Sequence, residues 1–406
     1  MRRHLQLTEY KTSASIPLSH EERDALRELV PSLTIEPSVG TEDRYDITPG
    51  STIGAVQLDG FSIEIQPKIP IDRVVFLISY ALDPKQWLDS GFDFATADSL
   101  VDAIVPGFAR QLRRALQRGL LQGYRTQEDS LATVRGQIRF GDQIRQRQGL
   151  MLPLEVTFDE FTEDIVENQI LKAAIHRLSY RRIRSEPVRR MLREFDALLA
   201  SVELVPFDPR NLPDVHFTRL NEHYQPAIAL AKLILRSTSW ELRQGRVQAS
   251  AFLVDMNRVF EEFVIIALRE ELRVNVREFP ANARGRALFL DQAKCVRLEP
   301  DVSWWHGNQC LFVGDVKYKR IDVKGYKHPD LYQLLAYTTA THLTRGMLIY
   351  AAGESEPRTH EVPMAGKLLE VVSLDLSGTP EDILSQMRKL AQRIRQEARE
   401  TKTLAY

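Results

Sequence analysis

The sequence predicts a multidomain α+β protein, with a β-rich N-terminal domain, a mostly helical middle region and a C-terminal α/β domain. Its 406 residues are more than one ordinary domain needs, and 43% of them are hydrophobic, which is enough to form several cores. The spacing of apolar residues also changes along the chain, from alternation to helical spacing and then to a mixture of the two. We therefore expect three parts, residues 1–70, 71–245 and 246–406.

The composition excludes several classes of protein. Lysine and arginine number 54 against 55 aspartate and glutamate residues, so the chain is not a globally basic nucleic-acid-binding protein, although a local basic face is allowed. The two cysteines, Cys295 and Cys310, exclude a disulfide framework and a four-cysteine zinc site. The N-terminus is polar, and the longest uncharged apolar stretch, Val74–Leu82, is too short to cross a bilayer. We expect a cytoplasmic protein with no membrane segment.

The N-terminal part has the alternation of a β-hairpin. Apolar and polar residues alternate through Val56–Leu58 and again through Phe61–Ile65. Asp59-Gly60 lies between them, and this dipeptide suits a type I′ turn because both central residues need a positive φ. Pro67 and Pro70 end the unit.

The middle part shows helical spacing in several stretches. Apolar residues recur at helical intervals in Val74–Ala81, Leu100–Leu121, Ile165–Leu178 and Ala227–Leu235, and a strand-like piece lies at Arg135–Arg139.

An arginine-rich segment, residues 176–193, begins at the end of the third of these helices, and Glu186 is its only acidic residue. Its members are Arg177, Arg181, Arg182, Arg184, Arg189, Arg190 and Arg193. The segment is either a phosphate-contacting face or a solvated pair of helices, and the neutral charge of the whole chain favours the solvated pair.

The C-terminal part mixes helices and strands. We expect a helix over Leu253–Leu272, strands near Arg273–Phe279, Arg286–Leu290, Val296–Trp304 and Cys310–Lys319, a helix from Pro329, strands near Gly346–Tyr350 and Val371–Leu376, and a final helix over Glu381–Glu400.

Charged residues in two of these strands indicate chemistry. Alternation along a strand places Asp315, Lys317 and Lys319 on one face. Opposite charges in an apolar strand are costly unless they are paired or bound to a metal. A turn at His306-Gly307-Asn308 would fold the chain back and bring Asp301 close to Asp315.

These residue types suit phosphodiester hydrolysis. Two carboxylates with a nearby backbone carbonyl form an oxygen-rich site for Mg²⁺, or for Mn²⁺ as the alternative. The Lys317 ammonium can orient an attacking water and offset charge on a phosphoryl group. The Pro-Asp…Asp-x-Lys hairpin is the signature of the PD-(D/E)xK nuclease fold. The alternative is a surface hairpin with an Asp315–Lys317 ion pair.

Two helices flank this pattern with further polar residues. Gln333 and Tyr337 are four residues apart, opposite the expected apolar face of their helix, and resemble the DNA-contacting helix of RecB-like nucleases. The alternative is an ordinary polar edge. Glu261 borders the apolar stripe of the preceding helix and Glu262 is beside it, so either could complete a metal shell or be a solvated side chain.

Taken in order, these pieces resemble the McrC family, the nuclease subunits of McrBC modification-dependent restriction systems. The C-terminal pieces are Phe260–Val264, Pro300-Asp301, Asp315–Lys319 and Gln333–Tyr337. The upstream pieces are Ile65–Ile69, Arg118–Leu120, Val134–Ile138 and Phe158–Phe161 with Asp164 and Asn168.

The resemblance implies a Mg²⁺-dependent DNA endonuclease that acts in 5-methylcytosine-specific restriction. Its partner would be a hexameric McrB-like AAA+ GTPase, docked through the N-terminal half and residues 1–70 in particular, with its GTPase stimulated. The substrate would be double-stranded DNA, and a dimer of nuclease subunits in the cleavage complex is allowed.

The resemblance also assigns roles to residues. Asp301 and Asp315 would bind Mg²⁺, Lys317 would assist the attacking water, and Glu261 would join the catalytic set. The side chains that would support the site or the DNA strand are Lys319, Gln333 and Tyr337.

Two alternatives stay open. The chain has no Gly-x-x-x-x-Gly-Lys-Ser/Thr motif, so we expect it to bind no nucleotide. It could be a RecB-like nuclease without methyl dependence. It could also be mainly an adaptor that activates a AAA+ motor, because residues 1–245 exceed what a nuclease needs.

Overall fold

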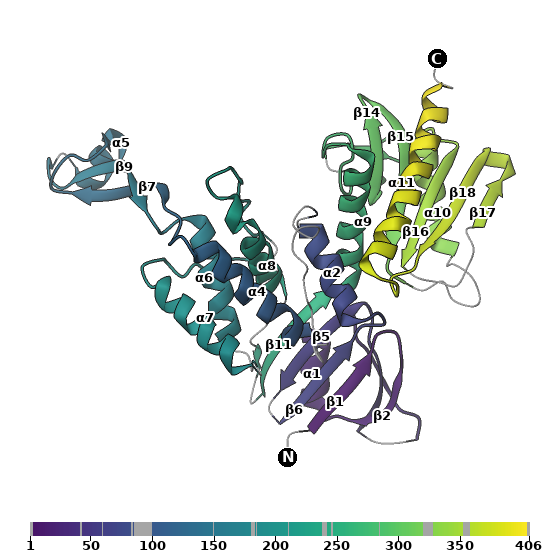
Figure 1. Cartoon of the computed structure of the whole chain (residues 1–406), viewed down its shortest axis with the longest axis horizontal. Helices are drawn as coiled ribbons and strands as arrows, with labels where there is room; N and C mark the ends of the chain where they lie inside the picture. The colour runs from purple at the N-terminus through teal and green to yellow at the C-terminus, as the bar shows by residue number, and fades with distance from the viewer. Residues whose placement is uncertain are drawn as a thin grey trace. The chain divides into compact units, whose positions relative to one another are not determined.

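The structure is a computed structural model, and it confirms the predicted multidomain α+β architecture (Figure 1). It describes residues 3–40, 43–58, 60–82, 84, 100–148, 150–179, 183, 185–209, 211–237, 242–244, 247–283, 285–319, 328–351 and 358–403. The chain divides into two compact units, one of residues 1–103 with 239–406 and the other of residues 104–238. These limits do not coincide with the boundaries expected at 70 and 245.

The first unit begins with two sheets and a helix. The larger sheet has the strand order β1-β6-β5-β11-β10, formed by Arg3–Thr8, Phe61–Gln66, Thr52–Leu58, Val247–Asp255 and Leu242–Gln244. The smaller sheet has the order β2-β4-β3, formed by Ser13–Pro17, Arg44–Thr48 and Thr34–Pro37. Helix α1 (His20–Leu29) begins at a capping box between Ser19 and Glu22, which satisfies two backbone donors.

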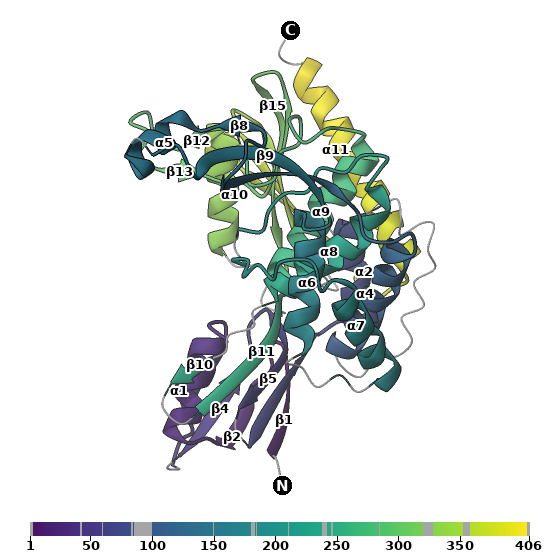
Figure 2. The same ribbon diagram turned by 90° about the vertical axis from the view of Figure 1, so that its left-hand side faces the viewer.

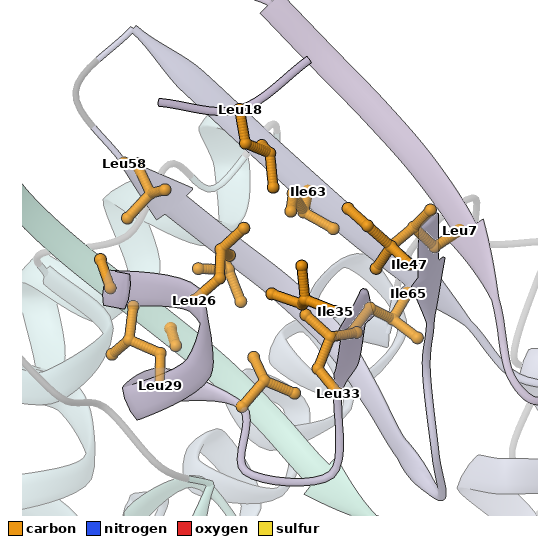
Figure 3. Close-up of a cluster of buried hydrophobic side chains, with 14 of the residues drawn as sticks. Leu7, Leu18, Leu26, Leu29, Leu33, Ile35, Ile47, Leu58, Ile63 and Ile65 are labelled. Carbon is orange, nitrogen blue, oxygen red and sulfur yellow. The ribbon is translucent and has the colours of Figure 1, made fainter. Parts of the chain in front are cut away.

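Apolar side chains from both sheets and from α1 form one core (Figure 3). The buried members shown there are Leu7, Leu18, Leu26, Leu29, Leu33, Ile35, Ile47, Leu58, Ile63 and Ile65. Alternate residues of β6 face this core, as the hydrophobic alternation predicts.

The predicted β5–β6 hairpin is confirmed. Leu58 pairs with Phe61, which leaves a two-residue connection, and Gly60 has the positive φ of 78° that such a turn uses. Its other turn residue, Asp59, lies outside the described residues.

The strand β11 is a correction to the sequence analysis, which expected a helix from about Leu253. Residues through Asp255 instead pair with β5, and helix α9 begins at Met256 (Figure 2). Residues 251–254 are all apolar and buried, and such a continuous run has no spacing of apolar residues that distinguishes a strand from a helix. Gly54 permits the pairing, because its φ is 126° and a Cβ there would lie 2.0 Å from Phe252 O.

The rest of the first unit is an α/β layer. Its sheet has the strand order β14-β15-β16-β18-β17, formed by Val302–His306, Gln309–Lys317, Arg345–Ala351, Lys367–Leu374 and Arg358–Val362. Strands β15, β16 and β18 are parallel, and β14 and β17 are antiparallel to their neighbours.

Helices cover both faces of this sheet. Helix α10 (His328–Ala340) lies on one side, and α9 (Met256–Leu272) and α11 (Pro380–Thr403) lie on the other (Figure 2). Helix α2 (Ile71–Leu82) packs against α9, and a short turn of helix, η2, covers Pro363–Ala365.

Three expected strands of this layer differ from the structure. Residues 273–279 form turns, because Arg273 ends α9 with a φ of 57° and Asn275 caps the following turn. The strand expected over Arg286–Leu290 is only β12 (Leu288–Phe289). The strand expected over Val296–Trp304 is split into β13 (Arg297–Leu298) and β14 by the segment that contains Asp301.

The second unit combines a helical bundle with a small sheet. Its helices are α4 (Leu100–Leu116, which starts in the first unit), α6 (Val166–Ser179), α7 (Glu186–Leu198) and α8 (Gln225–Arg236), with η1 at Glu222–Tyr224. The sheet β7-β9-β8 is formed by Gly123–Leu131, Leu154–Thr162 and Gln137–Ile138, next to α5 (Phe140–Arg147). The sequence analysis missed β7 and β9. Strand β7 is mostly polar and lacks an apolar period, and β9 has only the short alternation of Leu154, Val156 and Phe158.

The arginine-rich segment is partly engaged within the second unit. Arg177 donates to Leu235 O at the end of α8, and Arg189 and Arg193 pair with Glu186 on α7. Arg190 is exposed, and three further arginines, at 181, 182 and 184, lie outside the described residues. No helix in the described ranges is both long and apolar enough to span a bilayer.

Candidate active site

The expected hairpin that carries the charged residues is present. Strands β14 and β15 pair from Val302–Gly314 to His306–Gln309, and Gly307 in the turn has a φ of 58°. Asp301 comes immediately before β14, and its carboxylate accepts a hydrogen bond from Val316 N at 2.8 Å. The hairpin therefore brings Asp301 to the strand segment that contains Asp315.

Asp315 and Lys317 form an ion pair within this hairpin. The Asp315 side chain is 1% exposed, and the Lys317 ammonium also lies 4.0 Å from the Asp301 carboxylate. Burial and the negative charge of Asp301 raise the pKa of Asp315 to about 7. Burial also raises the pKa of Asp301.

Lys317 stays charged beside these carboxylates. Burial works to lower the pKa of the Lys317 ammonium, but the Asp315 and Asp301 charges outweigh it and raise that pKa. When both carboxyl groups are ionised, the two carboxylates and the one ammonium have a net charge of −1, and this charge is largely shielded from solvent.

The oxygen atoms of Asp315 fit a hard divalent cation. Both are buried, and among the described residues neither accepts a hydrogen bond of ordinary geometry, although the carboxylate is paired with the Lys317 ammonium. Within the described ranges, no three His, Cys, Asp or Glu side chains form a closed metal cage. An ion held by Asp301 and Asp315 would therefore keep positions for water or phosphate oxygens, which is how Mg²⁺ is usually bound.

The structure separates the two glutamates that the sequence left as alternatives. Glu261 lines the same cavity as Asp301 and Lys317, and burial raises the pKa of its carboxyl, which bonds to Asn282. Glu262 pairs with Arg258 at 2.9 Å, and its side chain is 40% exposed. The arrangement thus favours Glu261 as the site residue.

Helix α10 contributes a second charged pair. Lys319 lies 2.8 Å from Asp330, a buried residue in the first turn of α10, and Tyr350 of β16 donates its hydroxyl to the same carboxylate. Sequence reasoning missed Asp330 and Tyr350. No local signal marks them, because β15–β16 pairing places Tyr350 beside Lys317.

The predicted contact between Gln333 and Tyr337 is present, but Tyr337 is not on a solvent face. Gln333 donates to the Tyr337 hydroxyl at 2.7 Å, and that hydroxyl donates to Glu299 O at 3.2 Å. The Tyr337 ring is 2% exposed, in a core with Val313 and Leu343. Tyr337 thus ties α10 to the segment just before Asp301, which corrects the expected exposed position.

The site opens into a cavity of 930 Å³. Side chains from the α/β layer line one wall, namely Glu261, Asp301, Lys317, Lys319, Asp330 and Tyr350. Residues just after strands β1 and β6 line the other wall, including Glu9, Tyr10, Lys11 and Lys68. The sequence offered no signal for this second wall, because Lys68 and Glu9 are 250 and 309 residues away from Tyr318, the residue that follows β15.

The two tryptophans of β14, Trp304 and Trp305, lie in different surroundings. Trp305 is 7% exposed, and its indole N–H donates to Ser303 Oγ at 2.9 Å. Trp305 is therefore a packing residue in the core that also contains Val313 and Tyr337. Trp304 lines a different cavity from the one that contains Asp301.

Comparisons with known proteins identify relatives of this chain. The family model of the McrBC 5-methylcytosine restriction system component matches residues 47–351. The type IV methyl-directed restriction enzyme EcoKMcrBC of Escherichia coli strain K12 is 21% identical over 290 residues, which span 67% of this chain and 81% of that protein.

A solved structure shares the fold. It is a chain in the refined half-complex from a tetradecameric assembly of Thermococcus gammatolerans McrB AAA+ hexamers with bound McrC. The TM-score is 0.56 at 19% identity, over 96% of this chain and 100% of the other. The resemblance seen in the sequence is confirmed, and the chain belongs to the family of McrBC 5-methylcytosine restriction system components.

Proposed function

We propose that this chain is the DNA endonuclease subunit of a modification-dependent restriction system, built on a PD-(D/E)xK nuclease domain. The observation that carries the proposal is the convergence of Asp301, Asp315 and Lys317 on one hairpin, with Glu261 lining the same cavity. A buried and a half-buried carboxylate beside an ammonium match the chemistry of phosphodiester hydrolysis.

Asp301 and Asp315 would hold Mg²⁺, or Mn²⁺. When bound, the ion supplies charge stabilisation to the phosphoryl oxygens and lowers the pKa of a water molecule. The Lys317 ammonium, on the same face of β15, orients the attacking water and offsets the charge that develops on the phosphorus oxygens. Water adds to phosphorus, the bond to the 3′ oxygen breaks, and that oxygen takes a proton, leaving 5′-phosphate and 3′-hydroxyl ends.

We infer that a McrB-like AAA+ GTPase hexamer is the partner. The support is family membership and an apolar surface on the β7–β9 sheet, with α5 and the loops beside it. More than half of each of eight large hydrophobic side chains is exposed there: Tyr124, Val134, Phe140, Ile144, Leu150, Met151, Leu152 and Phe161. Apolar surface of this extent is typical of a protein interface. Docking through the N-terminal half would stimulate the GTPase of the partner.

The test is cleavage of plasmid DNA with and without 5-methylcytosine, in Mg²⁺, with the AAA+ partner and GTP added or omitted. We expect cleavage that needs methylation, partner and GTP, and that disappears in Asp315→Asn. Cleavage by Asp315→Asn at the wild-type rate would overturn the assignment. Cleavage of unmethylated DNA without a partner would instead identify a stand-alone nuclease.

A further inference from the structure

The second wall of the active-site cavity belongs to the N-terminal sheets. We propose that the turn Thr8–Lys11, at the end of β1, is part of the active site and holds the DNA strand opposite the carboxylates, through the Tyr10 ring and the Lys11 ammonium. The inference rests on the proposed nuclease function and names a substrate-contacting surface for it. Tyr10 and Lys11 line the same cavity as Asp301, so a strand bound in this cavity lies beside these side chains.

The backbone of the turn is held in an unusual conformation. Tyr10 has a φ of 57°, its N–H donates to Pro49 O at 2.9 Å, and Lys11 N donates to Thr8 O at 3.1 Å. A bulky residue with a left-handed backbone is uncommon, and such positions gather at ligand-contacting sites. The conformation presents the Tyr10 ring, which is 42% exposed, to the cavity.

Buried contacts fix this wall relative to β15. Lys68 Nζ donates to Tyr318 O at 2.6 Å and lies 3.8 Å from the centre of the Tyr318 ring. The Glu9 carboxylate accepts from Lys68 N at 2.9 Å and from the Tyr318 hydroxyl at 3.2 Å. Tyr318 directly follows Lys317, so the turn is tied to the end of the strand that carries the site.

A second set of contacts fixes the wall relative to α9. Met256 N donates to Ser51 O at 2.9 Å, and the Asn257 amide donates to Ser51 Oγ at 2.6 Å. Both donors lie in the first turn of the helix that carries Glu261. The distance between the turn and the acidic residues is therefore set by the fold.

The chemistry of the wall suits a nucleic-acid strand. Lys11 has an exposed side chain at the cavity, where an ammonium can contact a backbone phosphate. The Tyr10 ring offers a flat surface for a sugar or base, and the Lys68 ammonium lies 5.0 Å from its centre. The acidic neighbour, Glu9, is 2% exposed and turned toward Lys68 and Tyr318, so its charge does not face a strand directly.

The experiment compares Lys11→Gln with Lys389→Gln in the full-length chain. Lys389 is exposed on α11 and does not line this cavity. Binding to a methylated DNA duplex is measured in the Asp315→Asn background over a series of salt concentrations. If Lys11 contacts a phosphate, Lys11→Gln makes the negative slope of log affinity against log salt shallower by about 0.9, and Lys389→Gln leaves the slope unchanged.

The aromatic contact has its own pair of variants. Tyr10→Phe keeps the ring, whereas Tyr10→Ala removes it at the same backbone position. We expect Tyr10→Ala to weaken duplex binding about fivefold or more, with Tyr10→Phe close to the parent. In the cleavage assay of the complete complex, Lys11→Gln and Tyr10→Ala should raise KM more than they lower kcat.

The outcomes separate this inference from the proposed function. If Lys11→Gln and Lys389→Gln have the same salt slope and the same KM, or if Tyr10→Ala binds DNA like the parent, the inference is wrong. The proposed function would still stand if Asp315→Asn removes cleavage. Thermal unfolding midpoints equal to the parent's show that the variants fold.

Discussion

The Asp301 carboxylate accepts the backbone N–H of Val316 at 2.8 Å, the residue that lies between Asp315 and Lys317 on β15. One acidic side chain thus holds the hairpin together and also lines the cavity, next to the Lys317 ammonium that pairs with the second acidic side chain, Asp315. The hydrogen bond to Val316 N uses one of the two carboxylate oxygens of Asp301, so this residue can have both a structural role and a ligand role.

This relationship predicts a difference between two substitutions of Asp301. Asp301→Asn keeps an oxygen that can accept from Val316, whereas Asp301→Ala leaves a buried N–H without a partner. Both remove the same charge beside Asp315, so charge effects cancel in the comparison. We expect the alanine variant to be less stable than the asparagine variant by about 1–3 kcal/mol in urea denaturation. Equal stabilities would show that the hydrogen bond does not hold the hairpin.

Divalent cations should stabilise the protein in a pH-dependent way. Because the pKa of Asp315 is raised to about 7, the folded protein binds a proton there more tightly than the unfolded chain. Metal-free stability therefore falls as the pH rises through about 7, and Mg²⁺ or Mn²⁺ competes with that proton. We expect metal affinity to increase by up to about tenfold per pH unit below pH 7 and then to level off.

Calorimetric titration of Mn²⁺ at pH 6 and pH 8, with thermal unfolding in parallel, measures this effect. Asp315→Asn serves as the control, because it cannot supply the carboxylate. An increase in unfolding temperature with metal that is as large in Asp315→Asn as in the wild type would place the metal elsewhere.

The neighbouring glutamates of α9 form a matched pair. Glu261→Gln changes a half-buried carboxyl that lines the cavity, and we expect cleavage to fall by about 10–100-fold, the range seen when support of a metal site is lost. Glu262→Gln breaks only a surface pair with Arg258, so cleavage should change little. The measurement is the cleavage rate of each variant at saturating Mg²⁺. Equal losses of cleavage in Glu261→Gln and Glu262→Gln would contradict the assignment of Glu261 to the site.

The Tyr337 hydroxyl should matter for the position of Asp301. Tyr337→Phe keeps the buried ring but removes the bond to Glu299 O, two residues before Asp301. We expect a loss of about 1 kcal/mol in stability and a lower kcat. Tyr332→Phe, on the exposed side of the same helix, is the control. An unchanged kcat in Tyr337→Phe would mean that this bond does not position the site.

A buried carboxyl far from the cavity should control stability at neutral pH. Burial, with the nearby Glu370 carboxylate, raises the pKa of Glu397 on α11 to about 7. The stabilisation from its protonated form is full below pH 4.5 and lost as the pH rises through 7. Glu397→Gln should therefore gain stability relative to wild type at pH 8, by at most about 3 kcal/mol, and lose that gain at pH 4.

Urea denaturation at the two pH values measures the effect. Glu400→Gln, an exposed position on the same helix, should show no such pH dependence. A constant difference between Glu397→Gln and wild type at both pH values would contradict the raised pKa.

The elements that the sequence predicted well were those with a strong local period. The β5–β6 hairpin, α2, α6, α8, α10 and α11 follow from alternation or helical spacing that one face of a core imposes. The strands β7, β9 and β11 were missed or misread. Strand β7 is polar on both faces, and β9 has only the short alternation of Leu154, Val156 and Phe158. In β11 the run 251–254 is apolar on both faces, so it has no period of two.

By itself, the sequence determined the charged hairpin and its candidate residues. Asp301, Asp315 and Lys317 could be recognised because strand alternation and a short turn act over a few residues. Only the tertiary structure decided that Glu261 rather than Glu262 faces the cavity, that Tyr337 is buried, and that Asp330 and Tyr350 join the site. It also decided that Tyr10 and Lys11 form the opposite wall. These choices depend on contacts between segments tens to hundreds of residues apart, which no local spacing encodes.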